Sequence, residues 1–512
     1  MGASDAYAKF EWKEISTGVW QRDIDEVEHF YAALKQLFAG SGRMFYAITG
    51  HVVLNTPVPE GVKADEFAAR LDAALRQAWL HIRHDYPTIA SRVHLDESGV
   101  PKKTYNAFPV GDAAAEAIEE WLKTTFKPVE TTATGVEWCD RDPPAPQVPT
   151  LFVLTPPLAE DATTIRRDVV LRSPHDILDG MGTMALFNTL LKHAAGILES
   201  VEPVALPVFG EEHVRLSPPL RVAAQIPAEL TPEEEAALGA IIQGNLGAWV
   251  AGKEIAVLPY KPGNEVPGVH HRASLLLSEA ETTEILKKAK ALGLTATHAF
   301  HAAIAIVSRD LQPRKEAARE VRHLNYTLLS ERVKCLPPYN TAEHAVTDYH
   351  SIAEQSVIVD LVVPAVGEEV TLEQHIEEFK KVGEIIKGYY VNPRNDPDHL
   401  KRIPGYWKSN FVPFVPVSPP TPPPPQPAPW ASLSSIGLID SVLDAKHGPI
   451  EVQHPWVTSE RLDNGLGVFL STFQGRLELS STWNEAWHEK EKVDDFLQRC
   501  KEVVVRALEV KA

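Results

Sequence analysis

The sequence predicts an α/β fold built in two parts. Its 512 residues exceed one ordinary hydrophobic core and suit two domains of about 200–250 residues each. Runs rich in β-branched and aromatic residues alternate with longer amphipathic, helix-type patterns. The stretch 204–227 is spaced by prolines and is typical of a connection. We therefore expect an N-terminal lobe at 1–203, a connection at 204–265, and a C-terminal lobe at 266–512 with a proline-rich loop at 413–429.

The first lobe shows strand and helix patterns in alternation. Residues 42–54 are rich in β-branched and aromatic side chains, whereas residues 64–84 carry apolar side chains at helical spacing. The predicted elements are, in order, a strand at 42–54, helices at 64–84 and 112–125, strands at 151–154 and 168–171, and a strongly amphipathic helix at 182–198.

The second lobe begins with a strand and a capped helix. Ser278 and Glu281 form a capping-box pattern at the start of a helix that runs to residue 292. The next helix is rich in alanine, which permits close packing. The predicted elements are a strand at 271–277, helices at 278–292 and 294–307, and a strand at 323–329.

Composition narrows the classes of function. The formal charge is −19 and the pI is near 5.5, so the surface repels phosphate backbones and anionic membranes, and we expect no nucleic-acid partner. Three widely spaced cysteines favour a reducing compartment without a disulfide framework. The chain begins without a signal-peptide pattern and contains no run of 18 apolar residues. We expect a cytoplasmic monomer without a membrane span.

The segment with the clearest chemistry begins at His175, where an apolar strand pattern gives way to a helix pattern. It reads His-Asp-Ile-Leu-Asp-Gly, with Asp179 and Gly180 at its end. Imidazole ionises near neutral pH and can accept a proton from a hydroxyl that attacks a carbonyl. The residues alone also allow a capping or core histidine. His175 is our candidate general base.

Residues 173–182 resemble the active-site motif of acyltransferases related to peptide-synthetase condensation domains. This superfamily includes plant BAHD acyltransferases, chloramphenicol acetyltransferase and fungal trichothecene O-acetyltransferases, and the chain is most similar to trichothecene 15-O-acetyltransferase-like proteins. Softer matches follow in the family's order across residues 40–510. They are an arginine-bearing segment at 331–339, a terminal strand pair at 468–483 and a closing helix at 491–510. Neither the plant Asp-Phe-Gly-Trp-Gly motif nor the double histidine of condensation domains is present.

The resemblance implies two chloramphenicol-acetyltransferase-like lobes, each with a mixed sheet, and a tunnel at their interface. His175 would lie in this tunnel, with the thioester donor entering from one face and the acceptor from the other. In the family the motif's aspartate points away from the tunnel and pairs with an arginine, so we expect Asp179 to pair with Arg332. A solvated Asp179 is the alternative. Gly180 would supply a positive φ or a close backbone approach.

Further candidates come from the family's layout. Ser434 and Ser435 fall where the family places a strand edge beside the tunnel, so either is a candidate oxyanion donor; exposed strand-end hydroxyls are the alternative. Asn325 and Tyr339 are candidates for the acceptor side. We expect no metal, because the motif lacks a second histidine at ligand spacing. We also expect no serine-hydrolase chemistry, because the chain has no Gly-x-Ser-x-Gly elbow.

The resemblance implies an acyl-CoA-dependent O-acyltransferase that transfers an acetyl group to a hydroxyl of a fungal secondary metabolite, a terpenoid or polyketide alcohol. It implies no bound cofactor, with acyl-CoA as co-substrate. Three alternatives remain open: a condensation enzyme that takes its acyl group from a separate carrier protein, a cyclase or pericyclase with the same fold, and a non-catalytic binding protein.

Overall fold

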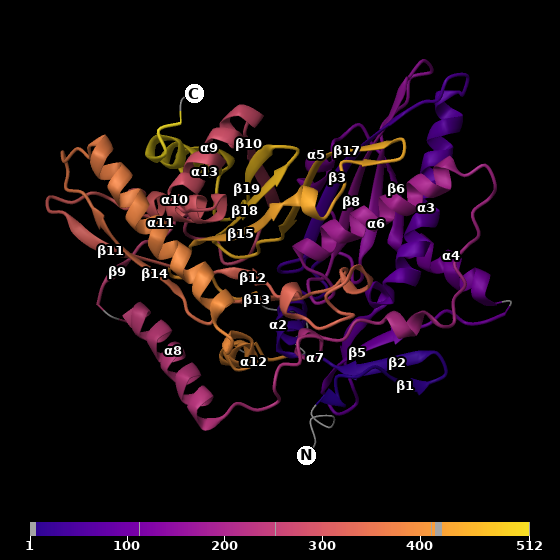
Figure 1. Cartoon of the computed structure of the whole chain (residues 1–512), viewed down its shortest axis with the longest axis horizontal. Helices are drawn as coiled ribbons and strands as arrows, with labels where there is room; N and C mark the ends of the chain where they lie inside the picture. The colour runs from indigo at the N-terminus through magenta and orange to yellow at the C-terminus, as the bar shows by residue number, and fades with distance from the viewer. Residues whose placement is uncertain (1–6, 112, 251, 411, 415–421, 511–512) are drawn as a thin grey trace.

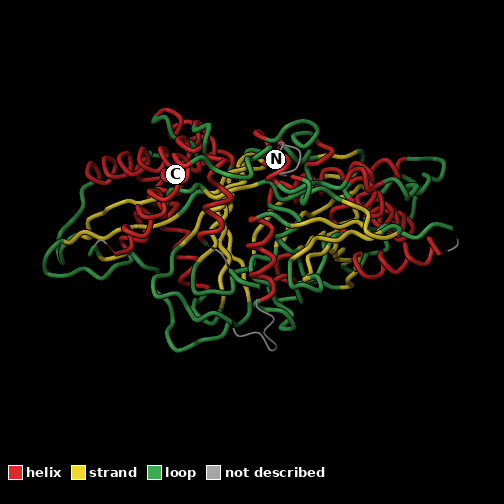
Figure 2. Tube along the Cα trace, turned by 90° about the horizontal axis from the view of Figure 1, so that it is seen from below, coloured by secondary structure: helices red, strands yellow, loops and turns green. Residues whose placement is uncertain are grey.

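The structure is a computed structural model of the chain, described for residues 7–111, 113–250, 252–410, 412–414 and 422–510. Two groups of strands and helices lie side by side, one coloured mainly indigo to magenta and the other orange to yellow (Figure 1). Figure 2 shows the same arrangement from below, with strands in the interior of both groups and helices toward the outside. The fold is therefore α/β with several mixed sheets, as the sequence predicts.

The sheet of the first group has six strands in the order β16-β17-β3-β8-β7-β6. Only β6 and β7 pair in parallel; the other neighbours are antiparallel. The strands are β3 (Ile48–Pro57), β6 (Phe126–Glu130), β7 (Thr150–Thr155), β8 (Thr164–Ser173), β16 (Lys446–His447) and β17 (Ile450–Ser459). Helices α3 (Ala64–Asp85) and α6 (Gly180–Glu199) pack on each other and on this sheet around one apolar core.

The main sheet of the second group has four strands in the order β10-β19-β18-β15. Its strands are β10 (His270–Leu276), β15 (Ala431–Leu438), β18 (Leu466–Phe473) and β19 (Arg476–Asn484). Beside it lies a three-stranded sheet of β14 (Val357–Val363), β11 (Arg319–Asn325) and β9 (Glu254–Ile255). Helix α10 (Ala296–Asp310) contacts β14 and β15, one from each sheet, so it lies within the second apolar core.

Smaller elements complete the fold. A four-stranded sheet contains β1 (Lys13–Ser16), β2 (Val19–Asp23), β5 (Pro101–Asn106) and β4 (Arg92–Leu95), and a ribbon contains β12 (Leu328–Ser330) and β13 (His350–Ile352). The remaining helices are α2 (Glu26–Gln36), α4 (Ala113–Thr125), α5 (Gly135–Cys139), α7 (Leu220–Ala223), α8 (Pro232–Val250), α9 (Glu279–Ala291), α11 (Leu372–Asn395), α12 (His399–Ser409) and α13 (Lys490–Ala507).

The chain crosses between the two groups. Strands β16 and β17 come from the last 70 or so residues, yet β17 pairs along its length with β3, which comes from the first 60. Val452 and Val457 of β17 lie in the first group's core. The lobe boundaries at residues 203 and 266 stay a prediction. Strands β16 and β17 are the part of 266–512 that joins the sheet formed by residues of 1–203.

Most predicted elements are confirmed, and three differ. The strand predicted at 42–54 begins only at Ile48, because Tyr46 has a φ of 59°, which interrupts an extended backbone. The strand predicted at 323–329 is divided into β11 and β12, which pair with different partners. The predicted connection contains a 19-residue helix, α8, that the proline spacing did not indicate.

Two predictions fall partly on residues outside the description. Asp112, the first residue of a predicted helix, lies outside it, and so do residues 415–421 of the predicted proline-rich loop. The described residues 422–429 of that loop contain no helix or strand. Among the described helices none meets the length and hydropathy of a membrane span alone; α9 and α10, bent by 91°, meet them only as a pair.

Candidate active site

The loop between β8 and α6 carries His175. Strand β8 ends at Ser173, and α6 begins at Gly180 with Asp179 as its N-cap, whose side chain accepts a hydrogen bond from the backbone N–H of Gly182. An N-cap aspartate satisfies amides that the first helical turn leaves free. His175 therefore lies at a strand-to-helix junction, as the sequence predicts.

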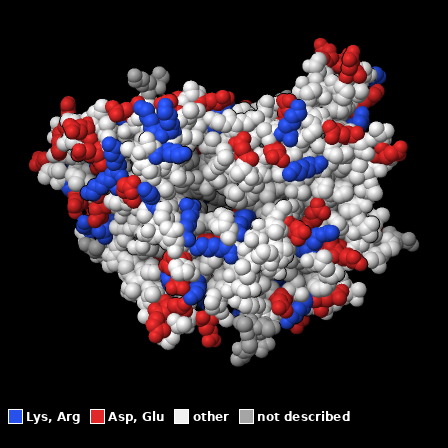
Figure 3. Space-filling view, viewed as in Figure 1, with Lys and Arg blue, Asp and Glu red and all other residues white. Residues whose placement is uncertain are grey.

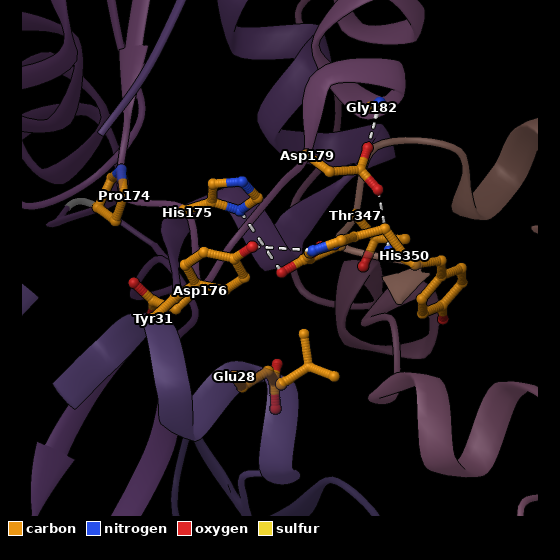
Figure 4. A network of polar contacts seen from close by, with 12 residues as sticks. Glu28, Tyr31, Pro174, His175, Asp176, Asp179, Gly182, Thr347 and His350 are labelled. Atoms are coloured by element: carbon orange, nitrogen blue, oxygen red, sulfur yellow. Dashed lines mark hydrogen bonds and ion pairs between the residues drawn. The ribbon is translucent and has the colours of Figure 1, made fainter. Parts of the chain in front are cut away.

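Asp179 pairs with Arg332, the partner expected from the sequence. The guanidinium donates through Nη1 to Oδ2 at 2.7 Å and through Nη2 to Oδ1 at 2.9 Å, a two-point contact. Oδ2 also accepts from the backbone N–H of Tyr349 at 3.1 Å. Both oxygens of this buried carboxylate are therefore occupied, and the group faces α6 and the segment before β13 (Figure 4).

Arg332 also holds the segment that contains Asp348. Its Nη2 donates to the carbonyl oxygens of Thr347 at 2.7 Å and of Ala345 at 3.1 Å. A Cβ at Gly182 would lie 2.8 Å from the Thr347 oxygen, so the start of α6 approaches this segment more closely than a side chain allows. The Asp179–Arg332 pair thus fixes residues 345–349 against the His175 loop.

The ring of His175 lies between a carboxylate and an aromatic face. Its Nδ1 is 3.7 Å from Oδ2 of Asp348, longer than a hydrogen bond, and neither atom has a hydrogen-bond partner among the described residues. The ring of Tyr31, from α2, stacks on the imidazole with centroids 3.8 Å apart and planes 1° apart. Because Nδ1 faces Asp348, Nε2 is the nitrogen left for a substrate (Figure 4).

Asp348 is shared between two histidines. Its other oxygen, Oδ1, lies 2.5 Å from Nδ1 of His350, and Nε2 of His350 lies 2.9 Å from the hydroxyl of Tyr31. Burial, the largest single influence, would raise the pKa of Asp348, but the combined effects of His350 and His175 outweigh burial and hold that pKa below its usual value. Burial alone would lower the pKa of His350, but the charge of Asp348 raises it. The two form a buried ion pair behind His175.

A second buried network fixes α2 against the loop. Glu28 accepts from Arg22 at 2.7 Å and from Lys103 at 2.6 Å, and Lys103 also donates to the carbonyl oxygen of Asp176 at 2.5 Å. Burial opposes ionisation of Glu28, but the two cations lower its pKa to about 2. Since α2 carries Tyr31, this network holds the stacked ring in place over His175.

His175 lines a cavity of about 380 Å³ whose walls come from both groups of the fold. Gly180 lines it too, and a Cβ there would lie 2.6 Å from Cδ1 of Ile436 in β15. Gly180 is not among the residues with a positive φ, and the atoms nearest to an added Cβ belong to side chains, so the close backbone approach stays a prediction. Whether the cavity continues as a tunnel between the lobes stays a prediction.

The remaining predicted residues divide into two groups. Ser434 and Asn325 line the cavity, although the amide of Asn325 already donates to the carbonyl oxygen of Ala431 at 2.7 Å. Ser435 and Tyr339 are not among the described residues that line it. The Ser435 hydroxyl lies 2.9 Å from that of Thr297, and the Tyr339 ring packs against another buried histidine.

Tyr31, Asp348 and His350 were missed by sequence reasoning. Asp348 lies two residues before His350, the first residue of β13. This strand has only three residues, which is too short to give a periodic signal. Asp25 and Glu28 form a capping box that indicates helix α2, but nothing in the sequence shows that its Tyr31 reaches His175.

Asp179, Asp348 and His350 place one potential metal ligand atom each within 4.8 Å of one another. The set does not suit a cation, because Arg332 binds both oxygens of Asp179 and would repel a metal ion there. The arrangement instead suits proton transfer, in which an imidazole facing a cavity is supported from behind by a carboxylate.

Comparisons with known proteins concern the whole chain. No family model matches the chain. The acetyltransferase pigO of Monascus ruber is 23% identical to this chain over 516 residues, and the match covers 98% of each protein. The O-acetyltransferase pigM of the same fungus is 25% identical over 503 residues, covering 98% of this chain and 87% of the relative.

Solved structures share the fold. The trichothecene 15-O-acetyltransferase TRI3 of Fusarium sporotrichioides superposes with a TM-score of 0.78 over 98% of both chains at 16% identity. The first condensation domain of the CDA synthetase superposes with a TM-score of 0.57 over 94% of this chain and 96% of its own, at 15% identity. The chain therefore has the fold of the condensation-domain and acyltransferase superfamily, and along its length it is related to fungal acetyltransferases.

Proposed function

We propose that the protein is an acyl-CoA-dependent O-acyltransferase that acetylates a hydroxyl of a secondary metabolite, with His175 as general base. One observation carries the proposal: the imidazole lines a cavity shared by both halves of the fold, while its Nδ1 faces the buried carboxylate of Asp348. The full-length relationship to fungal acetyltransferases supports the reaction class.

The geometry supports a simple sequence of proton transfers. Nε2 of His175 accepts the proton of the acceptor hydroxyl while the hydroxyl oxygen attacks the thioester carbonyl, and Asp348 stabilises the imidazolium that results. The tetrahedral intermediate then expels the thiolate, which takes the proton back from Nε2 as the ester forms. A thioester is already activated, so positioning, one base and one oxyanion donor are sufficient.

Ser434 is our candidate oxyanion donor, and Ser435 offers a matched control. The two are adjacent in β15, but only Ser434 lines the cavity, whereas Ser435 is bonded to Thr297. We expect Ser434→Ala to lower kcat by about 100-fold, the usual cost of one oxyanion donor, and Ser435→Ala to change it less than threefold. Equal effects of the two variants on steady-state kcat would remove Ser434 from this role.

An acyl-CoA donor bears negatively charged phosphate groups, which an acidic protein surface repels. Figure 3 shows Lys and Arg side chains gathered beside a hollow near the middle of one face, although the net charge is −19. A local basic area is what a phosphate-bearing thioester requires. A basic area also suits a carrier protein, so acyl-CoA is our proposed donor because of the similarity to fungal acetyltransferases, and the same assay with an acylated carrier protein tests the alternative.

The central experiment follows free thiol release from acetyl-CoA in the presence of candidate terpenoid and polyketide alcohols. We expect His175→Ala to lower kcat/KM by about 100- to 10,000-fold, since a general base contributes that much. His193→Ala is the control, because His193 lies on α6, the helix that follows the His175 loop, but pairs with Asp85 and is not among the described residues that line the cavity. Unchanged turnover in His175→Ala would exclude the general-base role.

A further inference from the structure

One side of helix α2 faces the loop that carries His175. Glu28, Tyr31 and Lys35 are spaced by three and four residues, so they lie along the same side of the helix. Lys35 Nζ lies 3.2 Å from Oδ1 of Asp176, the residue after His175, and Tyr31 stacks on His175 itself. Glu28 binds a buried lysine that donates to the same loop. Three side chains of α2 therefore fix the helix relative to the imidazole.

The ring of Tyr31 is held at both of its ends. The backbone of α2 carries one end, and at the other end the hydroxyl lies 2.9 Å from Nε2 of His350. His350 is in turn bonded through Nδ1 to Asp348, at 2.5 Å. These three residues and His175 form a closed circuit, because Asp348 and the Tyr31 ring both contact the imidazole, one beside its Nδ1 and the other on its face. Figure 4 shows the two rings lying parallel.

The Tyr31 ring supplies what Asp348 alone does not. Oδ2 of Asp348 is 3.7 Å from Nδ1 of His175, too far for the hydrogen bond that usually orients a catalytic imidazole. The phenol ring is parallel to the imidazole within 1°, with centroids 3.8 Å apart, so it prevents the imidazole from tilting toward that side. Contact between ring faces therefore replaces the missing hydrogen bond as the constraint on the imidazole plane.

The distance between the two rings also suits a positive charge. Neutral aromatic pairs usually keep their centroids about 4.5–7 Å apart, and the Tyr31–His175 pair is closer than that. The face of an aromatic ring is electron-rich and attracts a cation within about 6 Å of its centre. Tyr31 is therefore placed to stabilise the imidazolium that forms when His175 accepts a proton.

We propose that Tyr31 is a positioning residue for acyl transfer. Its ring fixes the plane of the His175 imidazole, so that Nε2 keeps one direction, and it stabilises the positive charge on that imidazole during the transfer. Its hydroxyl holds the ring in place through His350. The proposal rests on the proposed function, because it gives Tyr31 a part in the proton transfer to His175. The role needs the ring of Tyr31 more than its hydroxyl.

Two substitutions separate the ring from the hydroxyl. We expect Tyr31→Leu, which removes the ring, to lower kcat by about tenfold, the scale of a desolvated cation–π contact. Tyr31→Phe keeps the ring and should lower kcat less than threefold. Phe38→Leu is the matched control, because Phe38 is a buried aromatic residue just after α2 that is not among the described residues lining the cavity. Equal kcat values in Tyr31→Leu and Tyr31→Phe would overturn the role of the ring.

The pH profile distinguishes this role from a loss of packing. A general base works only while it is unprotonated, so kcat/KM falls on the acid side of the profile. Without the ring, the charged imidazole is less stable, and we expect the acid limb to shift to lower pH in Tyr31→Leu but to stay in place in Tyr31→Phe and Phe38→Leu. The position of the limb does not depend on how much of a variant is folded. A limb at the same pH in all of these proteins would overturn the charge stabilisation.

A third measurement needs no reaction. The ring current of a stacked phenol shifts the C–H protons of the imidazole upfield, and the His175 signals are identified as those lost in His175→Ala. We expect them to move downfield in Tyr31→Leu and to stay in place in Tyr31→Phe; signals unmoved by Tyr31→Leu would overturn the stack. If they move but His175→Ala still releases thiol from acetyl-CoA at the normal rate, the stack stands, and the proposed function fails together with the role of Tyr31 in it. If His175→Ala is inactive while Tyr31→Leu matches the wild type, the proposed function stands and the role of Tyr31 fails.

Discussion

Asp179 and Asp348 are two buried carboxylates beside the same loop, and they are used differently. Asp179 has every oxygen occupied, by Arg332 and by two backbone N–H groups. Asp348 has one oxygen bound to His350, while the other lies 3.7 Å from His175 without a hydrogen bond. A fully satisfied group fixes a shape, whereas a partly satisfied one is available to respond when charge develops nearby.

The aspartate of the sequence motif is therefore a structural group, and the aspartate that faces the imidazole lies 173 residues after His175 in the chain. Spacing of four residues would place Asp179 and His175 on one helical face, but the helix begins only after Asp179. The comparison predicts that a change at Asp179 mainly lowers the free energy of unfolding, whereas a change at Asp348 mainly lowers kcat.

The largest effect is expected at the Asp179–Arg332 pair. Asp179→Asn should lower the free energy of unfolding by about 3 kcal/mol, because it leaves the partly buried guanidinium of Arg332, 17% exposed, without its counter-ion. Denaturant unfolding measures this. Asp72→Asn is the control, since Asp72 also makes a two-point pair with Arg167 but is 35% exposed, and about 1 kcal/mol is expected there. A fully stable and active Asp179→Asn protein would contradict the structural role.

A smaller effect, on rate, is expected at Asp348. Asp348→Asn should lower kcat by about 10- to 100-fold and leave the acceptor KM nearly unchanged, because the carboxylate acts on the imidazolium and not on the substrate. The loss of about 10,000-fold seen for orienting aspartates in Ser-His-Asp triads is not expected, since the contact is longer than a hydrogen bond. Steady-state kinetics measure both parameters, and a rise in KM alone would contradict the role.

The smallest effect is a pH dependence of stability. The pKa of His350 is raised above 6.5, so its pairing stabilises the fold fully below pH 6.5 and is lost as pH rises through the folded pKa. The pKa of Asp348 is lowered below 3.8, so its contribution is present above pH 3.8 and is lost as pH falls through the folded pKa. The pair therefore contributes most between about pH 4 and 6.5, with a slope of at most about 1.4 kcal/mol per pH unit above that window.

Thermal melts from pH 5 to 8 test this pH dependence. They compare the stability of the wild type with that of a variant that carries both Asp348→Asn and His350→Asn. The double variant removes both members of the pair, so other titrating groups cancel in the difference. We expect the stability difference between wild type and variant to shrink as pH rises. A difference that is constant over this range would show that the pair does not titrate there.

The sequence predicted much of the fold and half of the site, for identifiable reasons. Long periodic segments such as α3 and α6 were found because many residues repeat the same signal. Arg332 was found because it lies in a segment with the family's pattern. Asp348 and Tyr31 could not be found, since their roles depend on a three-residue strand and on the docking of a helix, and neither leaves a spacing in the sequence.

The crossing of β17 into the first sheet has a consequence for engineering. An N-terminal fragment that stops anywhere before residue 446 would leave β3 as an exposed sheet edge, since its neighbour on that side comes from the other end of the chain. Chimeras that exchange the two halves between relatives at one breakpoint would combine a foreign strand with that edge. Productive exchanges need a second breakpoint, so that residues 446–459 travel with the half whose sheet they complete.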